Sequence, residues 1–385
     1  MFEILAQGPI FLICLALLLG VVVIIHELGH YYAARWAGAA IESFSVGFFQ
    51  PLFERSDKNG TRWRINWMPF GGFVSFVNQA EGLETLRDEG REITGLPYET
   101  LPAWKRIIIS LAGPAANFVL AVLLFACFFA VKGSAQYEVY ASSVTAEAPA
   151  AQGGMQVGDV ILSVDGTLVK TEVEIISATT MSSGKPMEFV VRRDDREVDL
   201  IITPERRLRE NALGQIIPQG TIDINLAIVE GSVQFVRYAP HQALLRGGSE
   251  TLTTLERTVY MLKRIATGRE PLALMSGPVA VGDAGRRIVN RTFEAEGNVL
   301  QKFESLFWRA MLLCAAVSVG IGFFNLLPLP MLDGGHVVFN TYEILRGQPL
   351  PEKVQEVALM AGLGLLLTLF VFITWGDILE TGLFN

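Results

Sequence analysis

Charged side chains are scarce in this chain of 385 residues. Asp, Glu, Lys and Arg make up only 18% of it, whereas hydrophobic residues make up 51%. Together with a mean hydropathy of +0.38, this composition excludes an ordinary soluble domain and indicates a membrane protein with a polar part. The net charge of −8 argues against a nucleic-acid partner, because no basic stripe is available to neutralise phosphates.

Cysteine is rare as well. Cys14, Cys127 and Cys314 lie in apolar runs without metal-ligand spacing, so we interpret them as small core residues. Residues Met1–Ile10 contain no Lys or Arg, and the apolar run that follows leads to a polar motif rather than to a small-residue cleavage site. We therefore expect a retained membrane span at this end of the chain, not a cleavable signal peptide.

Four apolar segments are long enough to cross a bilayer core, which takes about 20 residues. The sequence therefore predicts an α-helical membrane protein with four transmembrane helices. The predicted spans are roughly Pro9–Ala34, Arg106–Val131, Ala310–Leu332 and Val357–Trp375.

Lysine and arginine are distributed unevenly around these spans. The loop after the first span is rich in them from Arg35 to Arg106, and the short loop before the fourth span carries Arg346 and Lys353. The N-terminal tail has none. Because basic residues favour the cytoplasmic side, we expect the first and third loops in the cytoplasm. Both termini and the long second loop are then outside, which means the periplasm if the membrane is a bacterial inner membrane.

The first loop has a pattern of its own. Two segments rich in Phe and Trp flank Asn59-Gly60, a strong hairpin-turn signal, so Glu42–Val77 is predicted to form a β-hairpin. One interpretation is a hairpin at the membrane surface with aromatic anchors. The other is a re-entrant hairpin that dips into the membrane interior of the protein, where every backbone group needs a partner from protein or water.

The second loop divides into two parts. Tyr137–Pro204 alternates short β-like runs with turns, and Arg237–Ile265 has the apolar spacing of an amphipathic helix. The predicted organisation is residues 1–132 with two spans and the hairpin, 137–205 as a β-rich domain, 206–305 as an amphipathic helical region and 306–385 with the last two spans.

The end of the first span carries ionisable groups in the sequence HELGH. His26 and His30 are four residues apart, so on a helix they share one face and can grip one Zn²⁺, with Glu27 beside them as a general base. The alternative is a chance match, since short motifs produce false positives. Ionisable groups at membrane depth are costly, however, and mark function by default.

A catalytic zinc usually takes three protein ligands, so the two histidines are one ligand short. Asp333 and His336 lie in NLLPLPMLDGGH, at the predicted cytoplasmic end of the third span. HELGH lies at the predicted cytoplasmic end of the first span, so the two segments match in depth. We favour Asp333 because Gly334-Gly335 lets the backbone approach a metal, and His336 remains the minority alternative. Asn325 precedes Pro328 and Pro330 in the same segment. It predicts either a kinked helix with a satisfied amide or a groove that contacts a substrate backbone.

Three segments together carry a family resemblance: HELGH (His26–His30), AGPAANF (Ala112–Phe118) and NLLPLPMLDGG (Asn325–Gly335). With them the chain resembles the site-2 protease family of intramembrane zinc metalloproteases, in the form of bacterial regulator-of-sigma-E proteases. The segment SGPVAVG (Ser276–Gly282) is also similar to a family segment, without a physical role that we can assign to it.

The resemblance implies a zinc cofactor held by His26, His30 and Asp333, with Glu27 as catalytic base and Asn325 in contact with the substrate backbone. It also implies that Glu42–Val77 is the re-entrant hairpin of the family and that Tyr137–Glu205 is a PDZ domain. The best-known members carry two PDZ domains, whereas this chain has room for one. The expected partners are the lipid bilayer and single-span membrane proteins, such as an anti-sigma factor after a first cut or a remnant signal peptide.

Two other functions remain as alternatives. A membrane zinc transporter or sensor could use the same ligands, but it predicts polar groups at more than one depth of the helix bundle. An inactive scaffold with a peptide-binding PDZ domain predicts a damaged motif, whereas Glu27 is intact. Regulated intramembrane proteolysis is the function that the sequence favours.

Overall fold

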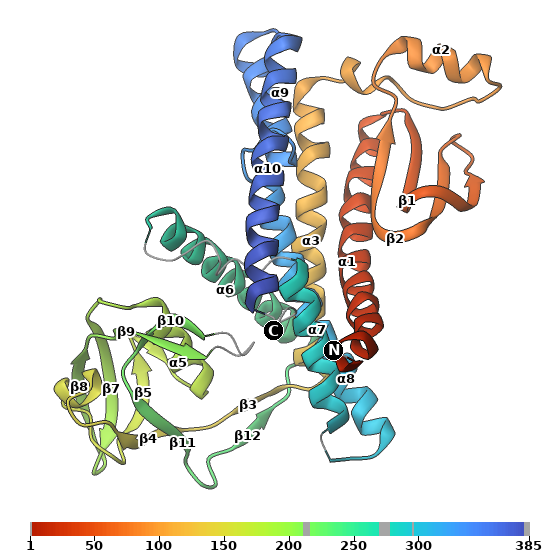
Figure 1. The fold of residues 1–385 in the computed structure, drawn as a ribbon. Coiled ribbons are helices and arrows are strands. Elements are labelled where there is room, and N and C mark those ends of the chain that lie inside the picture. Colours follow the sequence, from red (N-terminus) through yellow and green to blue (C-terminus); the bar gives the residue numbers. More distant parts are fainter. Residues whose placement is uncertain (1, 211–215, 269–277, 295, 381–385) are drawn as a thin grey trace. The chain divides into compact units, whose positions relative to one another are not determined.

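The computed structural model describes residues 2–210, 216–268, 278–294 and 296–380 (Figure 1). The chain divides into two compact units. The first holds residues 1–128, 244–259 and 275–385, and the second holds residues 129–243 and 260–274. The predicted family segment Ser276–Gly282 begins outside the described residues.

The first unit is mainly helical. Three of its helices are long and apolar enough to cross a membrane: Ala103–Val131, Val299–Asn325 and Glu352–Gly376. The first predicted span lies on a helix of 36 residues, but most side chains of the first half of that helix lie outside the description, so this span stays a prediction. The helices of the unit are α1 (Phe2–Ala37), α2 (Ala80–Asp88), η1 (Tyr98–Thr100), α3 (Ala103–Val131), α7 (Pro278–Glu294), α8 (Val299–Asn325), α9 (Asp333–Arg346) and α10 (Glu352–Glu380).

The third predicted span, Ala310–Leu332, is wrong at its second end. Helix α8 stops at Asn325, and a separate helix, α9, begins at Asp333. The cause is local, because Pro328 and Pro330 cannot donate helical hydrogen bonds and clash with the preceding turn. Asn325 and Asp333 consequently belong to different helices. They lie at the two ends of a short irregular segment.

Glycines let the long helices approach one another closely. A Cβ atom on Gly29 of α1 would lie 2.3 Å from the Ala112 carbonyl oxygen of α3, and one on Gly322 of α8 would lie 3.2 Å from the Cβ of Asn117 on α3. Small residues at such contacts are how membrane helices pack without a hydrophobic driving force between them. Helix α3 therefore contacts both α1, which carries HELGH, and α8, which leads to Asp333.

The predicted hairpin is present as β1 (Ile41–Ser56) and β2 (Arg62–Phe76), which pair antiparallel. Both strands fold back on themselves, so residues 41–46 pair on one edge with residues 72–76 and on the other edge with residues 62–65. The segment 72–76 is thus an edge of this small sheet. The depth of the hairpin in a membrane stays a prediction.

Asp57 ties the turn of the hairpin to α1. Its carboxylate accepts hydrogen bonds from the backbone N–H groups of Asn59 (2.8 Å) and Thr61 (3.0 Å), from the Trp63 indole (3.3 Å) and from the Tyr31 hydroxyl (3.1 Å). Burial by itself would raise the pKa of Asp57, but these hydrogen bonds lower it below its usual value. The network holds the sheet against the turn of α1 that ends the HELGH motif.

The second unit is built on a six-stranded antiparallel sheet in the order β11-β4-β5-β7-β8, with β6 beside β5. Its core holds the fully buried side chains of Ile161, Phe189 and Ile202. The sheet strands are β4 (Val139–Val144), β5 (Val160–Val164), β6 (Thr167–Leu168), β7 (Met187–Arg193), β8 (Arg196–Ile202) and β11 (Ile224–Ile228). The other elements are β3 (Ser134–Gln136), α4 (Pro149–Gln152), α5 (Glu172–Met181), β9 (Glu205–Glu210), β10 (Ile216–Thr221) and β12 (Gln234–Val236).

This unit extends past the boundary predicted at residue 205. Ile224 and Leu226 alternate toward the core, which lets β11 pair with β4 and complete the sheet. The described residues 206–210 and 216–236 accordingly hold strands, and the prediction of a helical region from residue 206 is wrong for them. The amphipathic helix predicted over Arg237–Ile265 is present as α6 (Pro240–Ala266).

The ion pair between Asp159 and Arg193 makes the stability of the second unit depend on pH. The carboxylate of Asp159 is 1% exposed and accepts two hydrogen bonds of 2.7 Å from Arg193 and one of 2.8 Å from the Gln156 backbone. Burial alone would raise the pKa of Asp159, but these partners lower it. The stabilisation is therefore complete above the unfolded pKa of about 4 and is lost as the pH falls through the lower folded pKa.

We expect Asp159→Asn to destabilise this unit by about 3 kcal/mol at neutral pH, because the substitution leaves Arg193 without its charged partner. The difference from the parent should shrink as the pH falls below about 4, because the unfolded parent chain binds a proton at Asp159 there before the folded chain does. Limited proteolysis of the full chain in urea, followed through cleavage within residues 129–243, measures both effects. Equal resistance of the two proteins at pH 7 would contradict the prediction.

Candidate metal centre

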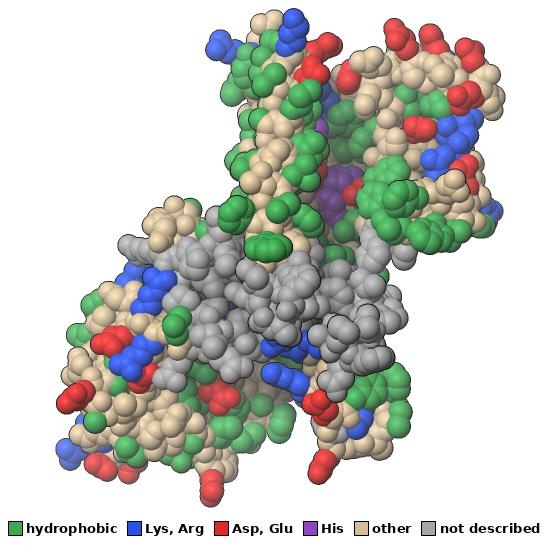
Figure 2. Space-filling model, in the orientation of Figure 1, with side chains coloured by type: hydrophobic (Ala, Val, Ile, Leu, Met, Phe, Trp, Pro, Cys, Tyr) green, Lys and Arg blue, Asp and Glu red, His purple; other side chains and the backbone are tan. Residues whose placement is uncertain are grey.

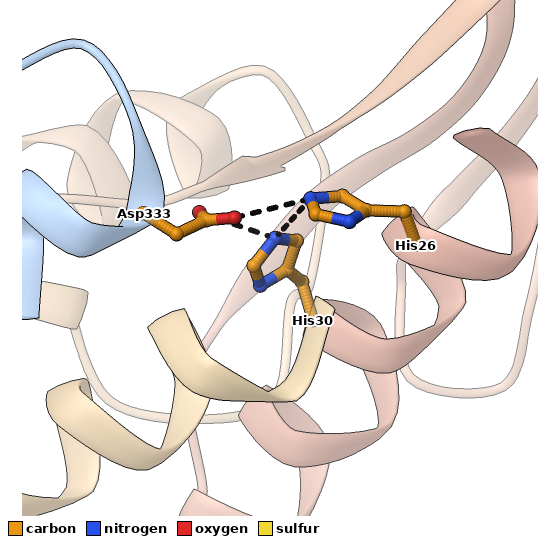
Figure 3. A group of neighbouring side chains, drawn as sticks. All are labelled: His26, His30 and Asp333. Carbon is orange, nitrogen blue, oxygen red and sulfur yellow. Dashed lines mark hydrogen bonds and ion pairs between the residues drawn. The ribbon is translucent and has the colours of Figure 1, made fainter. Parts of the chain in front are cut away.

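Three side chains from two helices meet in the first unit (Figure 3). His26 and His30 project from one face of α1, and Asp333 points toward them from the first residue of α9. The Nε2 atoms of the two imidazoles are 3.1 Å apart. Asp333 Oδ2 lies 3.1 Å from His26 Nε2, and Asp333 Oδ1 lies 3.3 Å from His30 Nε2. The site residues that the sequence predicted as ligands are brought together.

This geometry fits a tetrahedral metal. Two ligands that each bind zinc at about 2.0–2.1 Å lie about 3.3 Å from one another in a tetrahedron, close to the spacing of the three donor atoms here. His26 and His30 are 6% and 9% exposed, and Asp333 Oδ2 is buried without a hydrogen-bond donor. A buried carboxylate oxygen that faces two imidazole nitrogens is costly unless a cation completes the set. Two imidazoles and a carboxylate also match the ligand preference of zinc.

The cluster opens into a cavity of about 440 Å³. Figure 2 shows histidine side chains in a hollow between hydrophobic surfaces. Glu27 and Asn325 line this cavity as the sequence predicted, and so does His336, although His336 is not part of the group of three donors. Sequence reasoning missed other polar lining residues, because they lie outside any motif. They are Asn78, Tyr98 and Ser110.

Glu27 lies between the metal cluster and the hairpin. Its Oε2 accepts a 3.0 Å hydrogen bond from the backbone N–H of Val74. Val74 belongs to the edge segment 72–76, so its N–H points away from β1 and toward the cavity. Gly72 lies close by, since a Cβ atom there would sit 3.8 Å from Glu27 Cγ. The edge of the sheet therefore faces the carboxylate that the sequence predicts as a base.

The backbone of α3 passes close to the two imidazoles at Gly113. A Cβ atom at this position would lie 2.3 Å from His30 Nε2 and 2.8 Å from His26 Nε2. Both distances are shorter than any real carbon contact, so only glycine allows α3 to lie this close. The AGPAANF segment thus contributes a wall of the site, which the sequence pattern alone did not reveal.

The whole chain is similar to known proteins. Residues 14–369 match the profile of peptidase family M50. One relative is a protein of Mesorhizobium japonicum that was named a zinc metalloprotease by inference. It is 36% identical, and the match covers 94% of this chain and 96% of that protein. The metalloprotease MmpA of Caulobacter vibrioides is 34% identical, over 96% of this chain and 95% of that protein.

Among solved structures, the PDZ domain of an SdrC-like protein from Listeria monocytogenes matches 23% of this chain. It is 25% identical, 85% of its own chain is covered, and the TM-score is 0.19.

Proposed function

Because the chain belongs to peptidase family M50, the site-2 protease family, we propose that it is an intramembrane zinc metalloprotease. His26, His30 and Asp333 would hold the zinc, in keeping with their mutual spacing and with the orphan oxygen of Asp333. Zinc bound there supplies Lewis-acid chemistry, since it polarises a peptide carbonyl and makes a water more acidic. The observation that carries the proposal is this buried donor set at the wall of a cavity that Glu27 also lines.

Glu27 would act as the general base and then as the general acid. It takes a proton from the water that attacks the scissile carbonyl carbon and gives it to the amide nitrogen as the C–N bond breaks. The reaction consumes one water and leaves a new carboxyl group and a new amine. The hydrogen bond from the Val74 backbone to Oε2 leaves the other carboxylate oxygen of Glu27 free for this proton.

The edge segment 72–76 gives the substrate a place to bind. A transmembrane helix hides its carbonyl groups in its own hydrogen bonds, so it must unwind before it is cut. Because segment 72–76 is an edge of the sheet, an unwound segment can add to it as a further strand. The Val74 N–H donates to Glu27 and is therefore not one of the donors left for the substrate. The family resemblance implies that the hairpin is re-entrant, and this edge would then lie at membrane depth.

The proposed substrates are single-span membrane proteins, such as an anti-sigma factor after a first cut or a remnant signal peptide. The enzyme would lie in a bacterial inner membrane with its active site near the cytoplasmic side. The β-rich second unit would be a periplasmic PDZ-like domain. Among the described residues His26, His30 and Asp333 form the one group of metal donors, which does not favour the alternative of a transporter with donors at several depths.

The test is mass spectrometry of single-span membrane proteins in cells that contain either the parent enzyme or Glu27→Gln. We expect fragments cut within a membrane span in the parent cells and intact or once-cut precursors in the Glu27→Gln cells. Identical fragment patterns in the two strains would contradict the proposed function.

Asn325 is expected to act on the substrate and not on the metal. It ends α8, lines the cavity and is not part of the donor group. We expect Asn325→Ala to keep its zinc and to cleave about tenfold more slowly, because it loses one or two hydrogen bonds to the unwound backbone of the substrate. Zinc content and cleavage of one substrate, measured on the same preparation, separate the two effects. Unchanged cleavage would leave Asn325 with a role in helix packing alone.

The orientation of the chain is a separate prediction. We expect Asn59 in the cytoplasm and Ser183 in the periplasm, because the loop that contains Asn59 is rich in Lys and Arg. Single cysteines at these positions, in a background without Cys14, Cys127 and Cys314, can be labelled with an impermeant reagent. Spheroplasts should label Ser183→Cys only, and broken cells should label both. A shielded Ser183→Cys in spheroplasts would overturn the orientation.

A further inference from the structure

In both imidazoles of the metal centre, the Nδ1 atom, which faces away from the donor set, has a hydrogen-bond partner on α3. His30 Nδ1 lies 2.8 Å from the carbonyl oxygen of Ile109, and His26 Nδ1 lies 3.2 Å from the side-chain amide of Asn117. Both partners belong to α3. A carbonyl oxygen only accepts hydrogen bonds, so His30 must carry its proton on Nδ1, which leaves the lone pair of its Nε2 free for a cation.

Asn117 is a buried polar residue whose hydrogen bonds are only partly satisfied. Its side chain is fully buried, at 0% exposure, and one of its two amide heavy atoms has no hydrogen-bond partner. A buried polar group without its hydrogen bonds costs about 1–3 kcal/mol, so a purely structural position would suit an apolar residue better. As the amide stands in the structure, the atom without a partner is Oδ1, and Nδ2 is the atom that faces His26 Nδ1.

The chemistry of His26 decides which of the two amide atoms must face it. The nitrogen and oxygen of a carboxamide have the same shape, and a 180° turn of the group exchanges them. If Asn117 donated to Nδ1 of His26, the ring proton would be on Nε2, where it blocks a cation. If the Asn117 oxygen accepts from Nδ1–H, the lone pair on Nε2 faces His30 and Asp333. Only the second arrangement agrees with a metal at the donor set.

Helix α8 holds Asn117 in place from the other side. Ser318 of α8 donates a 2.8 Å hydrogen bond from its hydroxyl to the main-chain oxygen of Asn117. One turn later, Gly322 leaves so little room that a Cβ atom would lie 3.2 Å from Asn117 Cβ. The amide is thereby clamped between α1 and α8, with few rotamers open to it.

We propose that Asn117 is a positioning residue for the metal centre. Its side-chain oxygen accepts the Nδ1 proton of His26, and this fixes both the tautomer and the plane of the ring that offers Nε2 to zinc. The Ile109 carbonyl has the same role for His30, so α3 orients both histidines. This inference rests on the proposed function, since it concerns how the same site holds its zinc.

The experiment measures zinc affinity of the purified full-length protein by competition with a coloured chelator. Asn117→Ala is expected to weaken zinc binding about 10–100-fold, the usual cost of losing such a partner. Asn117→Asp still offers an oxygen acceptor and should bind zinc at least as tightly as the parent. Asn225→Ala is the matched control, because it makes the same chemical change at an exposed position on β11 of the second unit, and it should bind zinc like the parent.

Cobalt substitution provides a second readout. The visible absorption of Co²⁺ in the site reports ligand geometry, so Asn117→Ala should shift the bands while Asn117→Asp and Asn225→Ala keep the parent spectrum. If Asn117→Ala does not fold, the comparison of Asn117→Asp with the parent decides alone, and a much weaker affinity of Asn117→Asp would overturn the proposal. Parent-like affinity of a folded Asn117→Ala would also overturn it. A parent protein that binds no zinc would instead refute the proposed function itself.

Discussion

Gly113→Ala is expected to lose zinc, although Gly113 is not a ligand. The added Cβ would lie 2.3 Å from His30 Nε2 and 2.8 Å from His26 Nε2, so either the imidazoles or α3 must move by most of an ångström. Loss of the correct orientation of a metal ligand costs about 10–100-fold in metal affinity, and here both histidines would be displaced together. We expect zinc affinity to fall at least that much and cleavage to fall with it.

Gly320→Ala is the matched control for this prediction. Gly320 also lies in a membrane-spanning helix, α8, but a Cβ atom there would meet nothing within 4 Å. We expect the Gly320→Ala protein to keep its zinc and its activity, and to be slightly more stable because alanine favours helices. Metal content of both purified variants makes the comparison. A Gly113→Ala protein that binds zinc like the parent would show that α3 does not form the wall of the site.

The second large effect is expected from Glu27→Gln, which should keep zinc and lose nearly all cleavage. Glutamine has the shape of glutamate and can still accept the hydrogen bond from Val74, so the hairpin and the metal centre should be undisturbed. It cannot take a proton from water, and removal of a general base costs about 10²–10⁴ in rate. Zinc content and the cleavage rate of a purified single-span substrate measure the two properties.

An exposed glutamate gives the control for Glu27→Gln. Glu84 lies on the surface of α2, so Glu84→Gln makes the same chemical change far from any motif and should cleave like the parent. Cleavage by Glu27→Gln within a factor of a few of the parent rate would remove Glu27 from the chemistry. Loss of zinc from Glu27→Gln would make it a ligand instead of a base.

Sequence alone predicted the parts of the site that depend on local spacing. The four-residue interval between His26 and His30 places both on one helix face whatever surrounds them, and Asn59-Gly60 fixes a hairpin turn by its own backbone preference. Asp333 could be predicted as their neighbour only because it lies in a polar, glycine-containing segment at the matching end of another span. These features need little knowledge of tertiary packing.

The features that the sequence did not predict arise from contacts between distant segments. Gly113 and Asn117 acquire their positions only when α3 packs against α1 and α8, and no periodicity marks such a contact. The prolines predicted a break or kink near Pro328 and Pro330, but the apolar run continues through them, so the sequence did not place the end of α8 at Asn325. The strand β11 was missed since its place in the sheet depends on β4, far away in the chain.

The most direct test of the zinc centre is X-ray absorption spectroscopy on the purified protein at the zinc edge, for the parent and for Asp333→Ala. The parent should contain one zinc per chain with two imidazole nitrogens and at least one oxygen at about 2.0–2.1 Å. Asp333→Ala should lose most of the metal or show a changed set of light-atom ligands. Full zinc occupancy in Asp333→Ala with an unchanged spectrum would contradict the assignment of Asp333 and direct attention to His336.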